Sequence, residues 1–239
     1  MKDLNNKVAL ITGGSRGIGY GIAQALSQQG IRVGITSRKK ASAEKAAQEL
    51  TQEGKGAVIA IEADVRNLED QKKAVETILS KWGQLDILVA NAGIGHYASI
   101  EDLTPDQWQE TIDTNLTGVF YSLKAAIPAI KKSKGYILTI SSLAGTNFFA
   151  NGSAYNASKF GLTGFTQAAM LDLRDYGIKV STIMPGSVAT HFNGHTPSEE
   201  DSWKIQKEDL GELVVDLLRM NENALPSKIE IRPTRPIKK

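Results

Sequence analysis

Near its start the chain carries the stretch Val8-Ala9-Leu10-Ile11-Thr12-Gly13-Gly14-Ser15-Arg16-Gly17-Ile18-Gly19. Its short apolar run is typical of a strand that is buried on both faces. The helical pattern after the glycines places Ile18, Ile22, Ala25 and Leu26 on one face. The stretch therefore predicts a strand, a tight turn and a helix, which is the unit that builds parallel sheets.

The same alternation continues along the chain. Further apolar strands are predicted at residues 31–36, 57–61, 85–89, 136–140, 179–184 and 228–232, with helical patterns between them. This order predicts an α/β fold with a three-layer, doubly wound parallel sheet (Rossmann-like) of about seven strands. We see no internal repeat and no linker, so residues 1–239 are expected to form a single domain.

Local signals mark several boundaries of these elements. Asn67 is a predicted N-cap, and Thr104-Pro105-Asp106-Gln107 is a predicted capping box that opens a long helix containing Asn115. The helix that contains Tyr155 is expected to run to about Tyr176 and to end at Gly177. Residues 187–206 show no regular period, and we expect 190–206 to be a substrate loop.

The composition narrows the class of protein. Hydrophobic residues make up 41%, charged residues 23%, and the formal net charge is +2, so neither nucleic acid nor an anionic membrane is an expected partner. No apolar run approaches the roughly 20 residues of a membrane span. The chain has no cysteine and 3 scattered histidines, which fits a cytoplasmic location and predicts that it holds no metal site.

Ligands of doubly wound sheets bind beyond the carboxyl ends of the strands. The turn at Gly13, Gly17 and Gly19 lies at such an end, with the spacing Gly-x-x-x-Gly-x-Gly. Glycines there let the backbone approach a pyrophosphate at a helix N-terminus, so we predict that this turn binds a dinucleotide. The alternative is a plain strand-to-helix turn.

The end of the second strand indicates which dinucleotide binds. A carboxylate there would bind the 2′-hydroxyl of NAD, but this chain has Ser37 followed by Arg38. Arg38 and Arg16 together could pair with a 2′-phosphate. The sequence therefore favours NADP(H), the alternative being that both arginines are ordinary surface charges.

Tyr155 and Lys159 are candidates for acid–base chemistry. On a helix they are i and i+4 and share a face. A free tyrosine has a pKa of about 10. A neighbouring cation favours the phenolate, so we expect Lys159 to lower the pKa of Tyr155. The spacing alone also occurs by chance on surface helices.

With these motifs together, residues from about Lys7 to Thr190 resemble the short-chain dehydrogenase/reductase family, in its compact branch that includes 3-oxoacyl-ACP reductases. Several motifs in the same order carry the resemblance: Thr12–Gly19, Asp64-Val65, Asn91-Ala92-Gly93, Asn115, Ser142, Tyr155 with Lys159, and Pro185-Gly186 with Thr190.

The resemblance implies a catalytic role for Asn115, Ser142, Tyr155 and Lys159. Tyr155 would donate a proton to a carbonyl oxygen, and Ser142 would hydrogen-bond that oxygen. Lys159 would bind the nicotinamide ribose, and Asn115 would hold a water in a relay to Lys159. Ser141 is the competing serine, and only the family spacing favours Ser142.

The resemblance also extends the set of cofactor-binding residues. Asp64 and Val65 would flank the adenine, and Asn91 to Gly93 would line the cofactor cleft. The residues that follow Pro185-Gly186 would contact the nicotinamide. The full set is Gly13, Ser15, Arg16, Ile18, Gly19, Ser37, Arg38, Asp64, Val65, Asn91, Gly93, Tyr155, Lys159, Pro185, Val188 and Thr190. A turn carboxylate and a strand-ending glycine are the simpler interpretations of Asp64 and Gly93.

Two departures from the family pattern limit what it implies. The C-terminal end lacks Asp-Gly-Gly, and the loop after Thr190 is short, which weakens any specific prediction of acyl-carrier-protein reduction or of a tetramer. The expected substrate wall has a partly aromatic character and comprises Gly95, His96, Tyr97, Phe148, Phe149, His191 and Phe192.

The leading hypothesis is an NADPH-dependent enzyme that reduces a ketone or 3-oxo group of a small-molecule carbonyl substrate, reversibly, as a homo-oligomer (dimer or tetramer). One alternative is a dinucleotide-binding regulatory module without turnover. A sugar-nucleotide epimerase is a third hypothesis, but it would normally need a substrate domain for which 239 residues leave little room.

Overall fold

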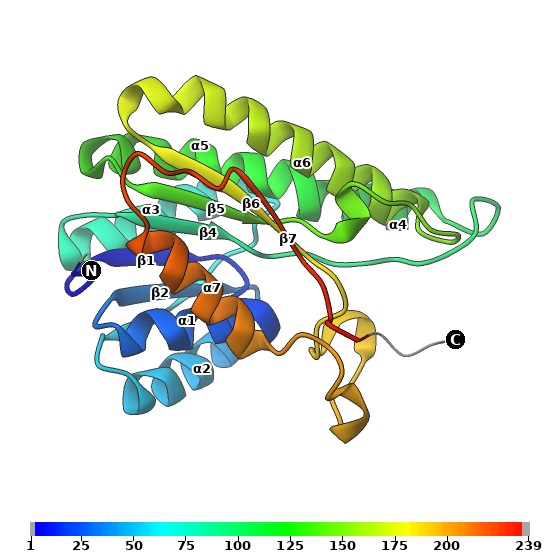
Figure 1. Cartoon of the computed structure of the whole chain (residues 1–239), viewed down its shortest axis with the longest axis horizontal. Helices are drawn as coiled ribbons and strands as arrows, with labels where there is room; N and C mark the ends of the chain where they lie inside the picture. The colour runs from blue at the N-terminus through cyan, green and yellow to red at the C-terminus, as the bar shows by residue number, and fades with distance from the viewer. Residues whose placement is uncertain (1–2, 236–239) are drawn as a thin grey trace.

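The computed structural model describes residues 3–235, which form a sheet of seven parallel strands (Figure 1). The order across the sheet is β3-β2-β1-β4-β5-β6-β7, which confirms the predicted doubly wound fold. Residues 1–2 and 236–239, the two ends of the predicted domain, lie outside the described residues. The strands are β1 (Val8–Ile11), β2 (Arg32–Ser37), β3 (Val58–Glu62), β4 (Ile87–Ala90), β5 (Tyr136–Ile140), β6 (Lys179–Pro185) and β7 (Lys228–Ile231).

Helices cover both faces of the sheet, so its central strands β1, β4 and β5 are buried on both sides, whereas the edge strand β7 is partly exposed. Figure 1 shows α1 (Gly17–Gln28), α2 (Lys40–Glu53) and α7 (Lys207–Arg219) on one face. The other face carries α3 (Leu68–Trp82), α5 (Gly118–Ser133) and α6 (Ser153–Leu173). Each face has its own apolar core, because side chains of a strand alternate between the two faces.

The middle of the sheet is where the chain changes its direction of winding. β1 pairs with β2 on one side and with β4 on the other. The buried carboxylate of Asp86 accepts hydrogen bonds from the Val8 N–H at 2.9 Å and from Lys7 Nζ at 2.8 Å. The Asp86 backbone N–H also donates to the Val8 carbonyl at 2.9 Å, and β4 starts at the next residue, Ile87, rather than at residue 85 as predicted.

The predicted long helix is interrupted. The capping box of Thr104 and Gln107 is present and opens α4 (Pro105–Ile112), as the sequence predicts. A π-helical turn at Asp113–Thr117 then separates α4 from α5. Asn115 lies in this turn and not in a regular helix, and such turns occur often at functional sites.

Residues 187–206, which we call the lid, are folded although the sequence shows no period there. The backbones of Ala189 and Ile205 hydrogen-bond at 2.9 Å, and Ile205 also donates to the Ser187 carbonyl at 3.1 Å. Short 3₁₀ turns at Phe192–Gly194 and Glu199–Asp201 lie between these ends. The lid is therefore a loop whose two ends are joined by backbone hydrogen bonds.

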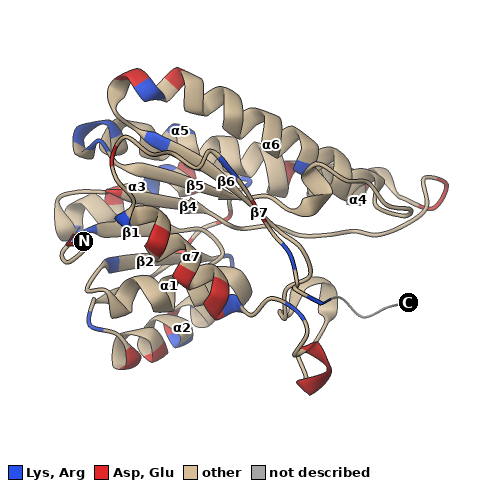
Figure 2. Cartoon of the chain, in the orientation of Figure 1, with Lys and Arg blue, Asp and Glu red and all other residues tan. Residues whose placement is uncertain are grey.

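The outer surface carries charges of both signs, spread over the helices and loops (Figure 2). The strands themselves are mostly uncharged, as burial between two helical layers requires. Within residues 3–235, no helix combines the length and apolar character needed to cross a membrane.

Candidate active site

The glycine turn is held open by the ends of the neighbouring strands. Gly13 has a φ of +66°, a conformation that favours glycine. The Asn91 side chain donates to the carbonyls of Thr12 at 2.9 Å and Gly13 at 3.1 Å. A Cβ on Gly19 would lie 2.5 Å from Asn91 Nδ2, so a larger residue there would disrupt this contact.

The first turn of α1 has the properties of an anion site. No side chain caps the helix, and its first turn contains no acidic residue. Its free backbone N–H groups and the positive end of the helix dipole point toward the turn that contains Ser15 and the exposed Arg16. The predicted residues Gly13, Ser15, Arg16, Ile18 and Gly19 are thus brought together around one helix N-terminus.

Charged residues gather at the carboxyl ends of β2 and β3. Arg38 follows β2, and its guanidinium lies 3.8 Å from the carboxylate of Glu110 on α4. Asp64 is bound by Arg66 through Nη2 at 2.6 Å. Burial alone would raise the pKa of Asp64, but hydrogen bonds from Arg66 and the charges of Arg66 and Arg38 hold it below its usual value.

The Val65 side chain packs against the start of α5. Its side chain is buried at 6% exposure and lies against Gly118, where an added Cβ would come within 2.8 Å of Val65 Cγ2. An adenine could therefore meet the Val65 backbone rather than an open side chain.

Tyr155 is nearly buried among aromatic rings. Its ring centroid lies 5.5 Å from that of Tyr97 and 5.9 Å from that of Phe192. Burial raises the pKa of the Tyr155 phenol well above 10, the nearby Tyr97 raises it further, and a hydrogen bond with the Ser142 side chain opposes the rise. The structure therefore contradicts the expectation of a lowered pKa, because burial of the phenol dominates the shift and only Ser142 opposes it.

Lys159 is a buried ammonium that forms no ion pair with a carboxylate of residues 3–235. Nζ donates to the Ile140 carbonyl at 2.9 Å, its one recorded hydrogen bond within residues 3–235, and lies 5.7 Å from the Tyr155 ring centroid. Burial lowers the pKa of Lys159 to about 8. Since an ammonium has three donors, two of them remain for a ligand or water.

The structure separates the two serines that follow β5. Ser141 is buried and hydrogen-bonds Thr163 Oγ1 at 3.0 Å and the Lys159 carbonyl at 3.2 Å, so it faces α6. Ser142 instead pairs with the Tyr155 phenol and lies 3.5 Å from the Pro185 carbonyl. Ser142 is thus the serine that reaches the tyrosine, as the family spacing suggests.

Asn115 connects three segments. Its Oδ1 accepts from Ile94 N at 2.8 Å, and its Nδ2 donates to Ile94 O at 2.9 Å and to Ser158 Oγ at 3.0 Å. Both donors of the amide are used, which leaves one acceptor lone pair on Oδ1. A Cβ on Gly93 would lie 3.3 Å from this Oδ1 and 3.6 Å from Lys159 Nζ, so these groups surround one small space.

The residues after β6 return to the glycine turn. Thr190 is buried at 8% exposure, and its Cβ would lie 3.4 Å from a Cβ on Gly17. Val188 forms the base of the lid with Ile205. Thr190 thus lies beside the glycine turn and the Pro185 carbonyl lies 3.5 Å from Ser142 Oγ, while their binding of a cofactor stays a prediction.

Asp201 holds the lid together. Its carboxylate pairs with His195 Nε2 and Lys204 Nζ, each at 2.5 Å, and accepts from Ser198 N at 3.1 Å. Hydrogen bonds from Lys204 and His195 keep the pKa of Asp201 well below its usual value. The neighbouring turn presents Phe192 to Tyr155.

The expected substrate wall is only partly assembled. Tyr97 and Phe149 meet with ring centroids 5.7 Å apart, and Phe192 joins them at Tyr155. Phe148 is 86% exposed and turns away. His96 is bound to Glu110 at 2.9 Å, and His191 is exposed.

A family model described as short chain dehydrogenase matches residues 7–201. The chain belongs to the short-chain dehydrogenase family. Its members bind a nicotinamide dinucleotide. The residues present fit that group. The N-terminus of α1 has no side-chain cap and lies beside the glycines, which suits a pyrophosphate, and the Lys159 ammonium has two N–H donors that are not used within the described residues.

Similar proteins of this family are enzymes that oxidise alcohols or reduce carbonyl groups. A trans-4-hydroxycyclohexanecarboxylate dehydrogenase of Sinomonas cyclohexanicum is 40% identical over 189 residues, which cover 77% of this chain and 73% of the relative. An alcohol dehydrogenase of the archaeon Thermococcus sibiricus, complexed with 5-hydroxy-NADP, superposes with a TM-score of 0.90 at 29% identity, covering 97% and 99% of the two chains. A 3-ketoacyl-(acyl-carrier-protein) reductase of Brucella melitensis, complexed with NADH, gives 0.87 at 30% identity, covering 98% and 100%.

Sequence reasoning missed several residues that organise this site. Ser158 fixes the Asn115 amide, Asp201 fixes the lid, and Glu110 joins His96 to Arg66 and Arg38. These partners are far apart in the chain, and no local pattern points to them. Ser158 alone had a signal, since it lies one residue before Lys159 on the same helix.

The Asp201 cluster generates a prediction about the lid. Asp201→Asn removes the charge that holds Lys204, so trypsin should cleave after Lys204 about 5-fold faster or more, since lost ion pairing favours local opening. Cleavage is followed by mass spectrometry under native conditions.

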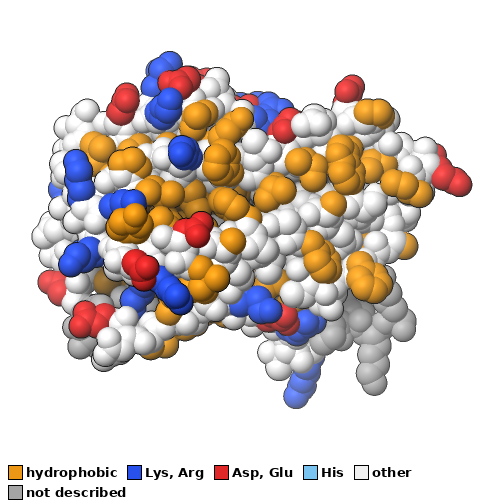
Figure 3. All heavy atoms as spheres, turned by 90° about the horizontal axis from the view of Figure 1, so that it is seen from above, with side chains coloured by type: hydrophobic (Ala, Val, Ile, Leu, Met, Phe, Trp, Pro, Cys, Tyr) orange, Lys and Arg blue, Asp and Glu red, His pale blue; other side chains and the backbone are white. Residues whose placement is uncertain are grey.

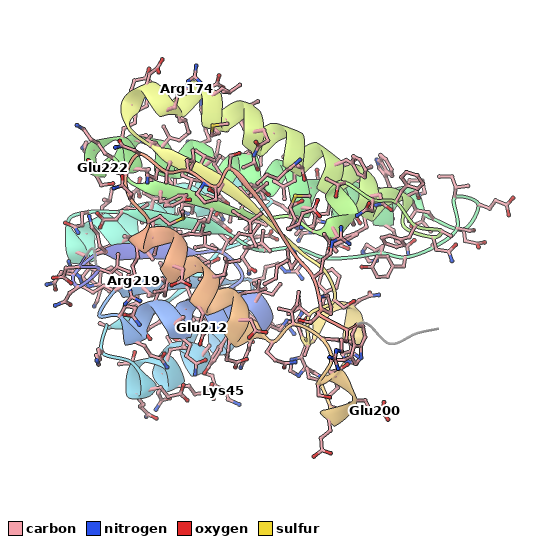
Figure 4. All side chains as sticks on the ribbon, viewed as in Figure 1. Lys45, Arg174, Glu200, Glu212, Arg219 and Glu222 are labelled. Carbon is pink, nitrogen blue, oxygen red and sulfur yellow. The ribbon has the colours of Figure 1, made fainter. Side chains whose placement is uncertain are left out.

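Glu200→Gln is the matched control, because Glu200 lies at the tip of the lid, is exposed and points away from the protein (Figure 4). It should be cleaved at the wild-type rate. Equal rates for wild type and Asp201→Asn would contradict the assigned role of Asp201.

Proposed function

We propose that this protein is an NADPH-dependent reductase that converts a ketone or 3-oxo group to a secondary alcohol, reversibly. The observation that carries the proposal is the buried Tyr155 phenol, whose pKa the Ser142 side chain lowers and whose ring centroid lies 5.7 Å from the buried Lys159 Nζ. This group lies at the carboxyl edge of the sheet, where the glycine turn is also found.

Tyr155 would act as the general acid in reduction. Its raised pKa keeps the phenol protonated at neutral pH, as a proton donor must be. When the proton moves to the substrate oxygen, the phenolate left behind gains stabilisation from the Lys159 ammonium and from Ser142. Bound nicotinamide would supply the hydride to the carbonyl carbon.

Lys159 and Asn115 would position and resupply the proton. The two unused donors of the Lys159 ammonium suit the hydroxyls of a ribose. A water between Asn115 Oδ1 and Lys159 Nζ would use the remaining lone pair of the amide, in the space beside Gly93. We therefore propose that the proton relay runs through this water, which would donate a hydrogen bond to Asn115 Oδ1.

The choice of NADPH rests on Arg38 and Arg16, which both follow strand ends at the site and have exposed side chains. No carboxylate occupies the position after β2 that would favour NAD. Similar structures contain 5-hydroxy-NADP in one case and NADH in another, so the preference is a matter for measurement.

The surface beside Tyr155 suits an apolar part of the substrate. Tyr97 and Phe149 are 43% and 46% exposed, although they are aromatic and touch each other. A bound ketone would cover these rings and Phe192, which favours apolar contact over charge pairing. In the adjoining lid, the side chains of His195 and Lys204 are both bound by Asp201.

We further propose that residues 1–239 form one cytoplasmic domain that assembles into a homo-oligomer. Figure 3 shows hydrophobic side chains gathered on the face above α5 and α6. Phe120 and Phe160 are each 44% exposed there, and Phe120 and Phe165 border a hollow of about 210 Å³. Exposed apolar surface of this kind is typical of subunit contacts.

The acid role of Tyr155 is tested by Tyr155→Phe. The variant should retain NADPH binding and lose at least about 100-fold in kcat on a panel of ketones, because general acid catalysis contributes about that much or more. Tyr176→Phe, at an exposed site on the far end of α6, is the control and should remain fully active.

Undiminished turnover of Tyr155→Phe would remove the proposed mechanism. NADPH binding by wild type with no activity on any carbonyl would instead favour a non-catalytic dinucleotide-binding module.

The cofactor preference is tested by Arg38→Ala. Loss of one guanidinium–phosphate contact should lower the ratio of kcat/KM for NADPH to that for NADH about 10-fold. Lys45→Ala on α2 is the control, since its exposed charge lies away from the strand ends (Figure 4). An unchanged ratio would show that Arg38 does not contact a 2′-phosphate.

The aromatic substrate surface is tested by Phe192→Ala. Removing a ring that the substrate covers should raise KM for apolar ketones about 5-fold, since such ring contacts contribute about 1 kcal/mol. A small polar ketone should be affected less. Phe148→Ala is the control because this ring faces solvent. Equal effects in the two variants would contradict the assignment.

A further inference from the structure

Glu110 is at the centre of a charge cluster beside the proposed 2′-phosphate position. Its Oε1 lies 3.4 Å from Arg66 Nη1 and 3.8 Å from Arg38 Nη1. Its Oε2 lies 2.9 Å from His96 Nε2. Glu110 therefore contacts side chains from the ends of three different strands, although it belongs to α4.

The cluster is balanced in charge. Asp64 takes Nε and Nη2 of Arg66, with contacts of 3.0 and 2.6 Å to Oδ2. The remaining contacts of both guanidiniums go to Glu110. Two arginines thus face two carboxylates, so an arriving phosphate meets no net positive charge from these four side chains.

Glu110 cannot move away without losing other partners. His96 and Arg66 hold its two oxygens, whereas Arg38 is the longest of its contacts and is 53% exposed. When Arg38 turns toward a phosphate, the carboxylate should remain near it. An exposed ion pair of this kind is weak and easily exchanged, and a phosphate is the stronger partner for a guanidinium.

We propose that Glu110 competes with the cofactor 2′-phosphate for Arg38 and thereby limits the preference of the protein for NADPH over NADH. The inference rests on the proposed nicotinamide cofactor site, and it adds a specificity-determining residue that lies outside the glycine turn and the end of β2.

The test measures binding directly. Dissociation constants of NADPH and NADH are obtained by fluorescence titration of wild type and Glu110→Gln at low ionic strength. The glutamine keeps the shape of the side chain and removes its charge. The NADPH/NADH affinity ratio should rise about 3- to 10-fold, the size expected for one partly solvated charge at short range.

The adenosine end is tested separately with adenosine 2′,5′-bisphosphate and AMP as competitors. The affinity for the bisphosphate should rise by the same factor in Glu110→Gln, and the affinity for AMP should change less. The gain should shrink at high salt, because exposed charges are screened. Glu212→Gln on the outer face of α7 is the control for loss of a carboxylate and should leave both ratios unchanged (Figure 4).

An unchanged or lower NADPH/NADH ratio in Glu110→Gln would overturn the proposal, a lower ratio meaning that Glu110 orients Arg38. The substitution should also have a smaller effect in an Arg38→Ala background, and an equal gain there would overturn the competition for Arg38. A wild-type preference for NADH would contradict the proposed cofactor choice alone, because Glu110 is judged by the change in the ratio.

Discussion

The pairing of β1 with β4 is the constraint on which the site depends. At this point the chain reverses its winding, so the loops after the two strands separate and leave their carboxyl ends accessible. The Asn91 side chain then ties the end of β4 to the carbonyls of Thr12 and Gly13. The glycine turn comes directly after β1, and Ile94, which contacts Asn115, comes shortly after β4, so both lie at this edge of the sheet.

A buried cation gives the site its electrostatic character. Burying an ammonium costs free energy unless it is hydrogen-bonded, and Lys159 has a carbonyl but no carboxylate beside it. Its pKa is therefore lowered to about 8, while burial raises the pKa of Tyr155. Burial thus moves the pKa values of the two groups in opposite directions and favours the neutral form of each.

The periphery is built differently, from charges that remain in contact with water. Asp201 gathers the lid, and Glu110 links the ends of β2, β3 and β4. Such contacts are individually weak and depend on salt, so small changes in sequence can alter them without disturbing the core. The centre of the site is accordingly fixed by burial, whereas Arg38, which we propose to set the cofactor preference, is exposed.

The sequence by itself determined the class of fold, the order in which strands and helices follow one another along the chain, and the motif residues. Apolar strands alternating with amphipathic helices allow few arrangements, and the caps at Asn67 and Thr104 are local signals that the structure confirms. Only the tertiary structure decided the π turn at Asn115, the direction of the Tyr155 pKa, and the partners of Glu110 and Asp201. Burial and long-range contacts are set when distant segments meet, and no local pattern in the chain records which segments those will be.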